Sequence, residues 1–236
     1  NGGMTQYLVV NAGSSSLKFA VYDRNLALFL KGQVSGIGSM PRLEVDGHAS
    51  RPVTDVTTPS EGLLVALEWL ADHGHEPEHF NGIGHRIVHG GASFSAPTLL
   101  DDETIEAIAV LTPLAPLHNP ANLEAVRLCR GLWPDVPQIA VFDTAFHLTN
   151  PAFATTYAVP ERWRAAGLRR YGFHGTSHKY VAHRAAEEVG RPLSDLQLVS
   201  IHLGNGASVC AVNRGQSMDS SMGMTPLEGL VMGTRS

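Results

Sequence analysis

Two short segments place many small hydrogen-bonding residues between apolar runs. The first is V-V-N-A-G-S-S-S-L-K-F-A-V, residues 9–21, and the second is S-I-H-L-G-N-G-A-S-V-C-A-V, residues 200–212. Backbone N–H groups gathered in a tight turn bind anions, and hydroxyl groups and a lysine add donors and charge. Phosphate suits such a turn because it carries several acceptor oxygens. A surface hairpin with polar decoration is the alternative, and the second similar segment leaves the two interpretations evenly balanced.

Neither segment matches a standard nucleotide-binding pattern. The first lacks G-x-x-x-x-G-K-[ST], and an alternating apolar strand follows it where that motif needs a helix. The second contains L-G-N-G-A-S, which begins like a dinucleotide fingerprint but lacks the third glycine. Both segments are therefore predicted to be strand–turn–strand hairpins.

Three further side chains are candidates for contact with a ligand: Arg86 and His174 for an anion, and Asp143 for a metal or substrate. Arg86 lies among apolar neighbours in G-H-R-I-V-H-G-G, where a guanidinium needs an internal partner or an anionic ligand. Asp143 ends the run Q-I-A-V-F-D, at the strand end where open α/β sheets bind ligands, although a helix or turn cap explains it equally well. His174 stands before a predicted helix in Y-G-F-H-G-T-S-H, and a core histidine with internal partners is the simpler explanation for it.

Two histidine motifs suggest other chemistry but lack its context. H-E-P-E-H, residues 75–79, matches a zinc pattern that requires a helix, and its proline disfavours a helix there. H-G-G at residues 89–91 is similar to an esterase oxyanion loop, but the chain has no G-x-S-x-G elbow. A metal-dependent hydrolase is kept as an alternative that predicts bound zinc.

The composition argues against several classes of protein. The 17 basic and 22 acidic residues give a formal net charge of −5, so the chain has no basic field for nucleic acid. No apolar run approaches the length of a membrane span. Cys129 and Cys210 are expected to be buried free thiols in a reducing compartment, which predicts a cytoplasmic protein.

Helical and strand patterns interleave along the chain, which predicts an α/β fold. Apolar periodicity and capping residues predict helices at residues 60–72, 101–111, 119–132 and 176–189, with Ser60 as the first N-cap. Strands are expected at residues 84–89, 138–143, 196–203 and 209–213, besides the first hairpin. The segment 138–143 is continuously apolar, which is typical of a strand buried on both faces.

The two polar hairpins suggest a duplicated architecture in which two similar domains each present a phosphate-sized tip. A Pro-rich and Arg-rich passage, residues 151–170, separates them. We therefore predict a first domain at residues 1–150 and a second that begins at residue 151 and runs to 236.

Seven segments in order resemble the acetate kinase family, which belongs with sugar kinases, chaperone ATPases and actin. They are V-N-A-G-S-S-S-L-K, G-H-R-I-V-H-G-G, P-L-A-P-L-H-N-P-A-N, V-F-D-T-A-F-H, Y-G-F-H-G-T-S-H, H-L-G-N-G-A-S and M-G-T-R-S. The resemblance implies a two-domain actin-like ATPase fold. Family members are longer, so the second, nucleotide-binding domain is expected to be incomplete here.

The resemblance also implies roles for individual residues. The residues with implied catalytic roles are Asp143, His174 and Arg235. The residues of the implied magnesium site are Asn11 and Asp143. Arg86 is similar to the residue that binds the acetate carboxylate. Four apolar residues resemble those that surround the acetate methyl group in the family: Val88, Leu117, Phe173 and Pro226. Nucleotide phosphates would be bound by Ser14, Ser16 and Lys18 and by the second loop, His202, Leu203, Gly204, Asn205 and Gly206.

The implied reaction is reversible transfer of the γ-phosphoryl group of ATP to acetate, with Mg²⁺ or Mn²⁺, giving acetyl phosphate and ADP. A propionate-preferring kinase and an inactive fragment of such a kinase are the alternatives. The resemblance further implies a homodimer. It also leads us to expect that the two hairpin tips face each other across one cleft, with Arg86 and His174 directed at the same anion.

Overall fold

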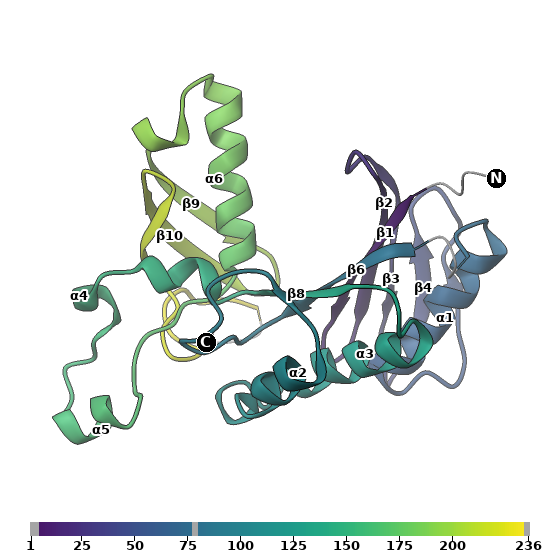
Figure 1. Ribbon diagram of the computed structural model, residues 1–236, viewed down its shortest axis with the longest axis horizontal. Coiled ribbons are helices and arrows are strands. Elements are labelled where there is room, and N and C mark those ends of the chain that lie inside the picture. Colours follow the sequence, from purple (N-terminus) through teal and green to yellow (C-terminus); the bar gives the residue numbers. More distant parts are fainter. Residues whose placement is uncertain (1–4, 77–79, 234–236) are drawn as a thin grey trace. The chain divides into compact units, whose positions relative to one another are not determined.

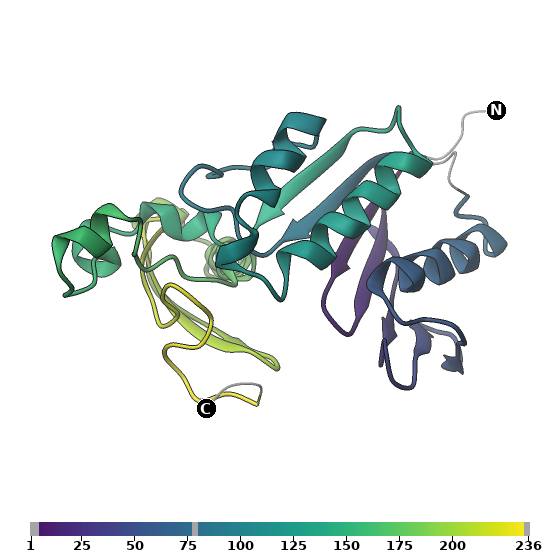
Figure 2. The ribbon, with the colours of Figure 1, turned by 90° about the horizontal axis from the view of Figure 1, so that it is seen from below.

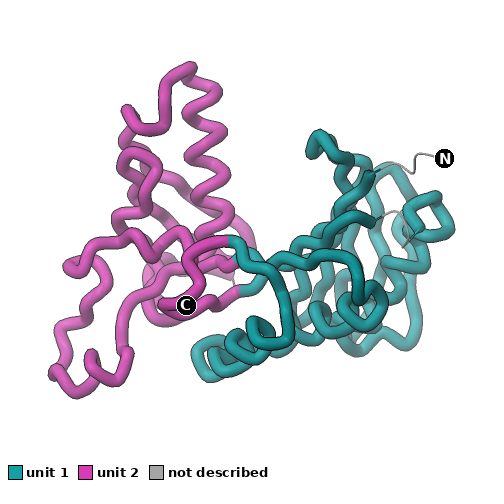
Figure 3. The backbone as a smooth tube through the Cα atoms, viewed as in Figure 1, with its two compact units in different colours: residues 1–87, 97–141 teal, residues 88–96, 142–236 magenta. Residues whose placement is uncertain are grey.

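The computed structural model describes residues 5–76 and 80–233. Contacts divide the chain into two compact units, coloured separately in Figure 3. Unit 1 comprises residues 1–87 and 97–141, and unit 2 comprises residues 88–96 and 142–236. The domain boundary that the sequence suggested at residue 150 stays a prediction.

Unit 1 is built on an eight-stranded mixed sheet with the order β5-β4-β3-β2-β1-β6-β8-β7. Its strands are β1 (Gln6–Ala12), β2 (Leu17–Asp23), β3 (Leu28–Ser35), β4 (Arg42–Val45), β5 (Arg51–Pro52), β6 (Phe80–Ile87), β7 (Thr98–Leu99) and β8 (Gln138–Phe142). β1 pairs antiparallel with β2 and parallel with β6, so it joins the hairpin to the rest of the sheet.

Two helices, α1 (Pro59–Asp72) and α3 (Asn119–Leu132), pack on each other and on one face of this sheet (Figures 1 and 2). The alternation of β1 explains which face they cover. Leu8, Val10 and Ala12 are buried in the core beneath the helices, whereas Val9 is 40% exposed on the opposite face. α2 (Asp102–Ala109) packs on α3, and the short 3₁₀ helix η2 (Thr112–Leu114) follows it.

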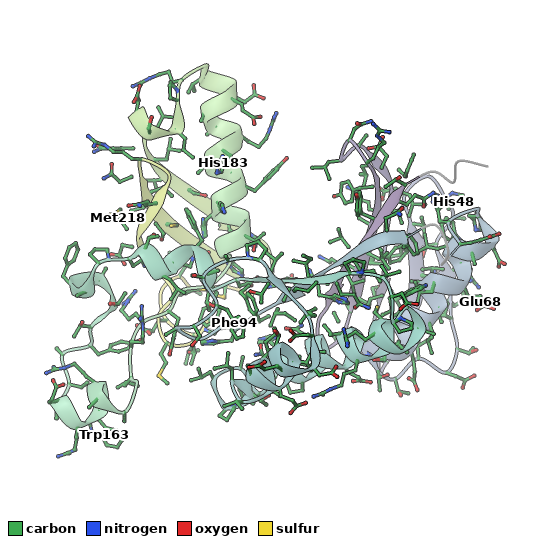
Figure 4. The ribbon with its side chains drawn as sticks, viewed as in Figure 1. His48, Glu68, Phe94, Trp163, His183 and Met218 are labelled. Carbon is green, nitrogen blue, oxygen red and sulfur yellow. The ribbon has the colours of Figure 1, made fainter. Side chains whose placement is uncertain are left out.

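Unit 2 contains a three-stranded antiparallel sheet, β11-β10-β9, formed by β9 (Gln197–Leu203), β10 (Ala207–Asn213) and β11 (Gln216–Ser220). Helix α6 (Gly175–Val189) packs on it, with Ala182 against Cys210 and Val212. The remaining elements of this unit are η3 (Ala145–Thr149), α4 (Ala152–Thr155), α5 (Glu161–Ala165) and η4 (Leu193–Asp195). The segment 88–96 contributes Phe94, which Figure 4 labels. The Phe94 ring stacks on the Phe142 ring, with 4.6 Å between the ring centroids.

The predicted duplication is confirmed at the level of the strands. In unit 1, β1, β2 and β3 follow one another as an antiparallel meander, and β9, β10 and β11 repeat it in unit 2. Each polar segment forms the turn between the first two strands of its meander. This α/β arrangement is the one expected of the duplicated, actin-like fold.

The four predicted helices and the predicted strands all appear, with three corrections. The N-cap of α1 is Thr58, not Ser60, because Thr58 accepts from the Glu61 N–H while the Glu61 carboxylate accepts from the Thr58 N–H. β6 begins at Phe80 and so extends further toward the N-terminus than predicted. β8 is not buried on both faces, since Ala140 is buried and Ile139 is 37% exposed.

Three other predictions concern the cysteines, the H-E-P-E-H segment and membrane-spanning helices. Cys129 and Cys210 are buried free thiols, as predicted. The H-E-P-E-H segment lies partly outside the described residues. Within the described ranges, the helices are all too short or too polar to cross a bilayer.

Candidate active site

The first hairpin tip is a closed turn anchored on both sides. The Gly13 N–H donates to the Ser16 carbonyl oxygen (2.8 Å), and the Ile37 N–H donates to the Ser15 carbonyl oxygen (3.0 Å). Asn122 of α3 donates from Nδ2 to the Ala12 carbonyl oxygen (2.6 Å) at the end of β1. The Gly13 N–H is therefore used within the turn, and the Ser14 hydroxyl is left at the exposed tip.

Two cationic side chains flank Asn11 in unit 1. Lys18 is the cross-strand partner of Asn11 in the β1–β2 pair, and Arg86 of β6 donates from Nη1 to Asn11 Oδ1 at 3.0 Å. Lys18 is exposed and Arg86 is half-buried. The sequence predicted an internal partner or an anionic ligand for Arg86. Asn11 is a neutral amide, and its oxygen orients one edge of the guanidinium.

The positive charge beside Asn11 is local. A hollow of about 520 Å³ on this face of the sheet is lined by Asn11, by Lys18 and Lys31, and by Glu44 and Asp46. Lys31 pairs with Asp46 (3.6 Å), and the two carboxylates balance the two lysines, so the hollow as a whole does not favour a polyanion. The row Lys18–Asn11–Arg86 is the part of unit 1 that is suited to a small anion.

Asp143 and His174 come together in unit 2 through the start of α6. The Gly175 N–H donates to the Asp143 carbonyl oxygen (2.8 Å), and a Cβ on Gly175 would lie 2.3 Å from that oxygen. Only glycine permits this approach. His174 is the N-cap of α6 and has left-handed backbone angles (φ 58°), which cost about 1–2 kcal/mol for a residue with a Cβ. The Asp143 side chain is 2% exposed.

The His174 ring is held by two neighbours. Its Nδ1 lies 2.8 Å from Ser208 Oγ on β10, and the ring stacks on His202 at 4.0 Å between ring centroids. His202 in turn has its Nδ1 2.9 Å from Ser177 Oγ. Two residues that the sequence assigned to different roles, catalytic and nucleotide-binding, are thus in direct contact.

Ser208 also meets a second histidine, His178. The Ser208 Oγ is 2.8 Å from His178 Nε2, and His178 Nδ1 is 2.9 Å from Ser200 Oγ. Burial and, to a lesser extent, the neighbouring histidines lower the pKa of His178 from 6.5 to about 3, so the ring is neutral at pH 7. Sequence reasoning missed His178 and Ser208. The available signal was the run H-G-T-S-H, in which a second histidine follows His174 within the first turn of the predicted helix.

A third histidine in this region, His147, is fully buried in unit 2. Its Nδ1 lies 2.7 Å from Ser217 Oγ and its Nε2 lies 2.9 Å from the Phe173 carbonyl oxygen. Burial lowers its pKa, while the hydrogen bond to Phe173 and the charges of Asp143 and Asp219 oppose that shift. The position of Phe173 is fixed by this contact.

The second hairpin tip is a short turn closed by the Gly204 N–H, which donates to the Gly206 carbonyl oxygen (2.9 Å). Leu203 is 79% exposed before the turn, and Asn205 is exposed within it. This confirms the predicted hairpin. Its assignment to nucleotide phosphates stays a prediction.

The residues assigned to the apolar pocket differ in exposure. Val88 and Phe173 are 5% and 2% exposed, and the Phe173 ring lies 5.5 Å from the His89 ring. Leu117, in unit 1, is 76% exposed. Pro226 is half-buried.

The segment that carries Pro226 is attached to the rest of unit 2 by polar contacts. Glu228 forms an ion pair with Arg170 (3.3 Å) and a hydrogen bond with the Tyr157 hydroxyl, which also accepts from the Met224 N–H (2.9 Å). Burial raises the pKa of Tyr157, and its hydrogen bond to Glu228 adds to that shift.

The remaining assignments are Arg235, for the transferring phosphoryl group, and the magnesium ligands Asp143 and Asn11. Arg235 lies outside the described residues. In the part of the chain that is described, no group of three His, Cys, Asp or Glu side chains converges as a metal site. The Asp143 carboxylate and the Asn11 amide oxygen are hard ligands of the kind that Mg²⁺ prefers, but Asn11 Oδ1 already accepts from Arg86.

Comparison with known proteins identifies a consistent set of relatives. The model of the acetokinase family matches residues 6–236. Acetate kinase from Bacillus subtilis is 48% identical over 240 residues, which are 99% of this chain and 61% of the relative. Acetate kinase from Halothermothrix orenii is 48% identical over 238 residues, 97% of this chain and 60% of the relative. The chain thus spans about three fifths of the length of these relatives.

Solved structures give the same result. A crystal structure of Porphyromonas gingivalis acetate kinase superposes with a TM-score of 0.89 at 38% identity, covering 98% of this chain and 61% of that one. A propionate kinase from Francisella tularensis superposes with a TM-score of 0.89 at 40% identity, covering 99% and 61%. Both likenesses support the fold described above.

Proposed function

Because the acetokinase family model matches residues 6–236, this chain belongs to that family, and we propose that it takes part in phosphoryl transfer between ATP and acetate. The products are acetyl phosphate and ADP, and the reaction is reversible. The observation that carries the proposal is the row Lys18–Asn11–Arg86, in which a neutral amide orients a guanidinium beside a second cation.

The chemistry of the reaction suits these residues. A small carboxylic acid has a pKa close to that of a Glu side chain, about 4.3, so acetate is ionised at pH 7 and needs no general base. The difficulty is to bring one anion in line with another while water is kept away. Fixed cations and donors offset that repulsion and stabilise the charge on the transferring group.

We assign the roles accordingly. Arg86 binds the acetate carboxylate, and Lys18 with Ser14 and Ser16 binds phosphate oxygens. His174 donates a hydrogen bond from its ring to the phosphoryl group in the transition state of the transfer, and Arg235 stabilises the same group. The loop Gly204–Gly206 binds the nucleotide phosphates with His202 and Leu203. Val88, Leu117, Phe173 and Pro226 surround the acetate methyl.

A divalent cation, Mg²⁺ or Mn²⁺, accompanies ATP in this proposal. When bound, it neutralises charge on the phosphate oxygens. Asp143 supplies the carboxylate that holds it in unit 2. Asn11 is the second residue assigned to the magnesium site, and its amide oxygen has a lone pair besides the one that accepts from Arg86.

We further propose a cytoplasmic homodimer. The two buried free thiols suit a reducing compartment. The homodimer rests on the family resemblance, and sedimentation equilibrium of the purified chain tests it directly.

A preference for propionate is the second candidate, favoured by the structural likeness to a propionate kinase at 40% identity. One methylene in an apolar pocket changes binding by only about 1–3 kcal/mol. The ratio of kcat/KM for acetate and propionate decides between the two substrates.

The proposed reaction is tested by trapping acetyl phosphate with hydroxylamine. ATP, Mg²⁺ and acetate are incubated with the 236-residue chain, and acetate kinase from Bacillus subtilis serves as the positive reference. Hydroxamate formation that requires all three reactants supports the proposal. Bound zinc with hydrolysis of simple esters would instead support a metal-dependent hydrolase, and anion binding without turnover would support an inactive fragment.

A further inference from the structure

Four side chains of unit 2 form one continuous hydrogen-bonded series. Ser200 Oγ lies 2.9 Å from His178 Nδ1, His178 Nε2 lies 2.8 Å from Ser208 Oγ, and Ser208 Oγ lies 2.8 Å from His174 Nδ1. Ser200 is 4% exposed, and His178 and Ser208 are fully buried. Protons in such a continuous series cannot be placed independently of one another.

The buried end of the series decides the direction of its hydrogen bonds. Among the described residues, the hydrogen-bond partner of the Ser200 hydroxyl is His178 Nδ1. A buried O–H without an acceptor is unfavourable by roughly the desolvation cost of the group. Ser200 therefore donates to His178 Nδ1, which must be unprotonated.

The remaining protons follow from the chemistry of imidazole and hydroxyl groups. A neutral His178 with a bare Nδ1 carries its proton on Nε2 and donates it to Ser208 Oγ. Ser208 then uses its own O–H to donate to His174 Nδ1. A neutral His174 whose Nδ1 accepts a hydrogen bond carries its proton on Nε2.

We propose that Ser200, His178 and Ser208 are positioning residues that fix the tautomer of His174, so that its Nε2 presents an N–H donor to the phosphoryl group. This inference rests on the role of His174 in the proposed function. The lowered pKa of His178, about 3, supports it because the ring stays neutral across the working pH range. Stacking on His202 fixes the plane of the His174 ring, so both the ring and its proton are preset.

The test is the ¹⁵N chemical shift of each ring nitrogen of His174 at pH 8.5, measured on the ¹⁵N-labelled chain. We expect Nε2 to have the shift of a protonated nitrogen and Nδ1 that of an unprotonated one. Exposed His183 on α6, labelled in Figure 4, is the internal reference for a ring outside the series. A protonated Nδ1, or a tautomer mixture equal to that of His183, overturns the proposal.

Variants test the direction of the series. Ser208→Ala removes the donor to His174 Nδ1 and is expected to lower the tautomer ratio about tenfold, the effect of one hydrogen bond. Ser200→Ala removes the hydroxyl that donates to His178 Nδ1 and so fixes the His178 tautomer. This variant is also expected to lower the His174 tautomer ratio. His178→Gln, whose amide can donate to Ser208 and accept from Ser200, is expected to restore the ratio, unlike His178→Ala.

Ser177→Ala is the matched control. It removes a hydroxyl that bonds a histidine of the same region, His202, but stands outside the series. The His174 tautomer should not change in this variant. An equal change in Ser177→Ala and Ser208→Ala would contradict the proposal.

The readout is independent of turnover. A preset tautomer in a chain that neither binds acetyl phosphate nor forms it would reject the proposed function and keep the hydrogen-bonded series. Phosphoryl transfer by a chain whose His174 is a mixture of tautomers would support the proposed function and reject the role of the hydrogen-bonded series.

Discussion

Asn11 supplies one of the contacts that orient Arg86 at the first site. The bond from Arg86 Nη1 to Asn11 Oδ1 joins two neighbouring parallel strands at their carboxyl ends. Asn11→Ala removes this acceptor and with it one of the contacts that orient the guanidinium. Hydrogen bonds to charged groups contribute about 1.5–3 kcal/mol, and Arg86 is half-buried, so we expect about tenfold weaker acetyl phosphate binding.

Isothermal titration calorimetry checks this prediction. Gln33→Ala is the control, because Gln33 lies on the same sheet and bonds Glu44 (2.6 Å) instead of a site residue. Equal affinities for the wild-type chain and Asn11→Ala would show that Asn11 does not orient Arg86.

The buried histidines make stability depend on pH in a defined direction. Burial lowers the pKa of His178 to about 3 and that of His85 to about 4, whereas histidine in an unfolded chain has a pKa near 6.5. As the pH falls, the unfolded chain takes up protons first. The free energy of unfolding is therefore fully retained above about pH 6.5 and declines as the pH falls toward 3–4.

Urea unfolding at pH 7.5 and pH 5 measures this decline. In His85→Gln the difference between the two pH values should be smaller, because the amide keeps a polar partner for Gln138 without titrating. A wild-type chain that is equally stable at both pH values would contradict the prediction.

At the scale of elements, the start of α6 depends on Gly175. A Cβ there would lie 2.3 Å from the Asp143 carbonyl oxygen, which is backbone and cannot rotate away. Gly175→Ala is expected to displace the helix start and to cost roughly 1–3 kcal/mol of stability, as overpacking does. His174 should lose its contact with Ser208 at the same time.

Gly131 in α3 is the matched control, since a Cβ at that helical position meets nothing within 4 Å. Gly131→Ala should stabilise the chain by about 0.5–1 kcal/mol. Thermal unfolding followed by circular dichroism compares the two variants. A Gly175→Ala chain at least as stable as the wild type would contradict the role given to Gly175.

The elements themselves were largely predictable because the apolar periods of the sequence are regular. Both polar hairpins and all four predicted helices follow from alternation, caps and glycines. The N-cap of α1 was misassigned because Thr58 and Ser60 both suit that position, and only the reciprocal bond with Glu61 distinguishes them. β8 appeared to be a doubly buried strand because its composition does not reveal that Ile139 faces outward.

The candidate site was predictable residue by residue but not contact by contact. Asn11 and Arg86 are far apart in the sequence, and their bond depends on the parallel pairing of β1 with β6. Likewise His174 and Ser208 meet only because α6 packs on the second meander. Long-range pairing of this kind has no signature in local composition.

At the scale of the molecule, the repeated meander gives each compact unit its own polar hairpin. Unit 1 contributes Lys18, Asn11 and Arg86, and unit 2 contributes Asp143, His174 and the Gly204–Gly206 turn. The proposed phosphoryl transfer requires one anion to meet groups from both sets. That Arg86 and His174 act on the same anion stays a prediction, and it is the central claim of the proposed function.

Affinity for acetyl phosphate tests that claim in the wild-type chain, Arg86→Ala, His174→Asn and the double variant. Asparagine is chosen at position 174 because it tolerates the left-handed backbone. We predict that each single change weakens binding about tenfold, and that the double change weakens it less than the product of the two, because both groups share one ligand. An unchanged affinity in either single variant would contradict a shared anion site.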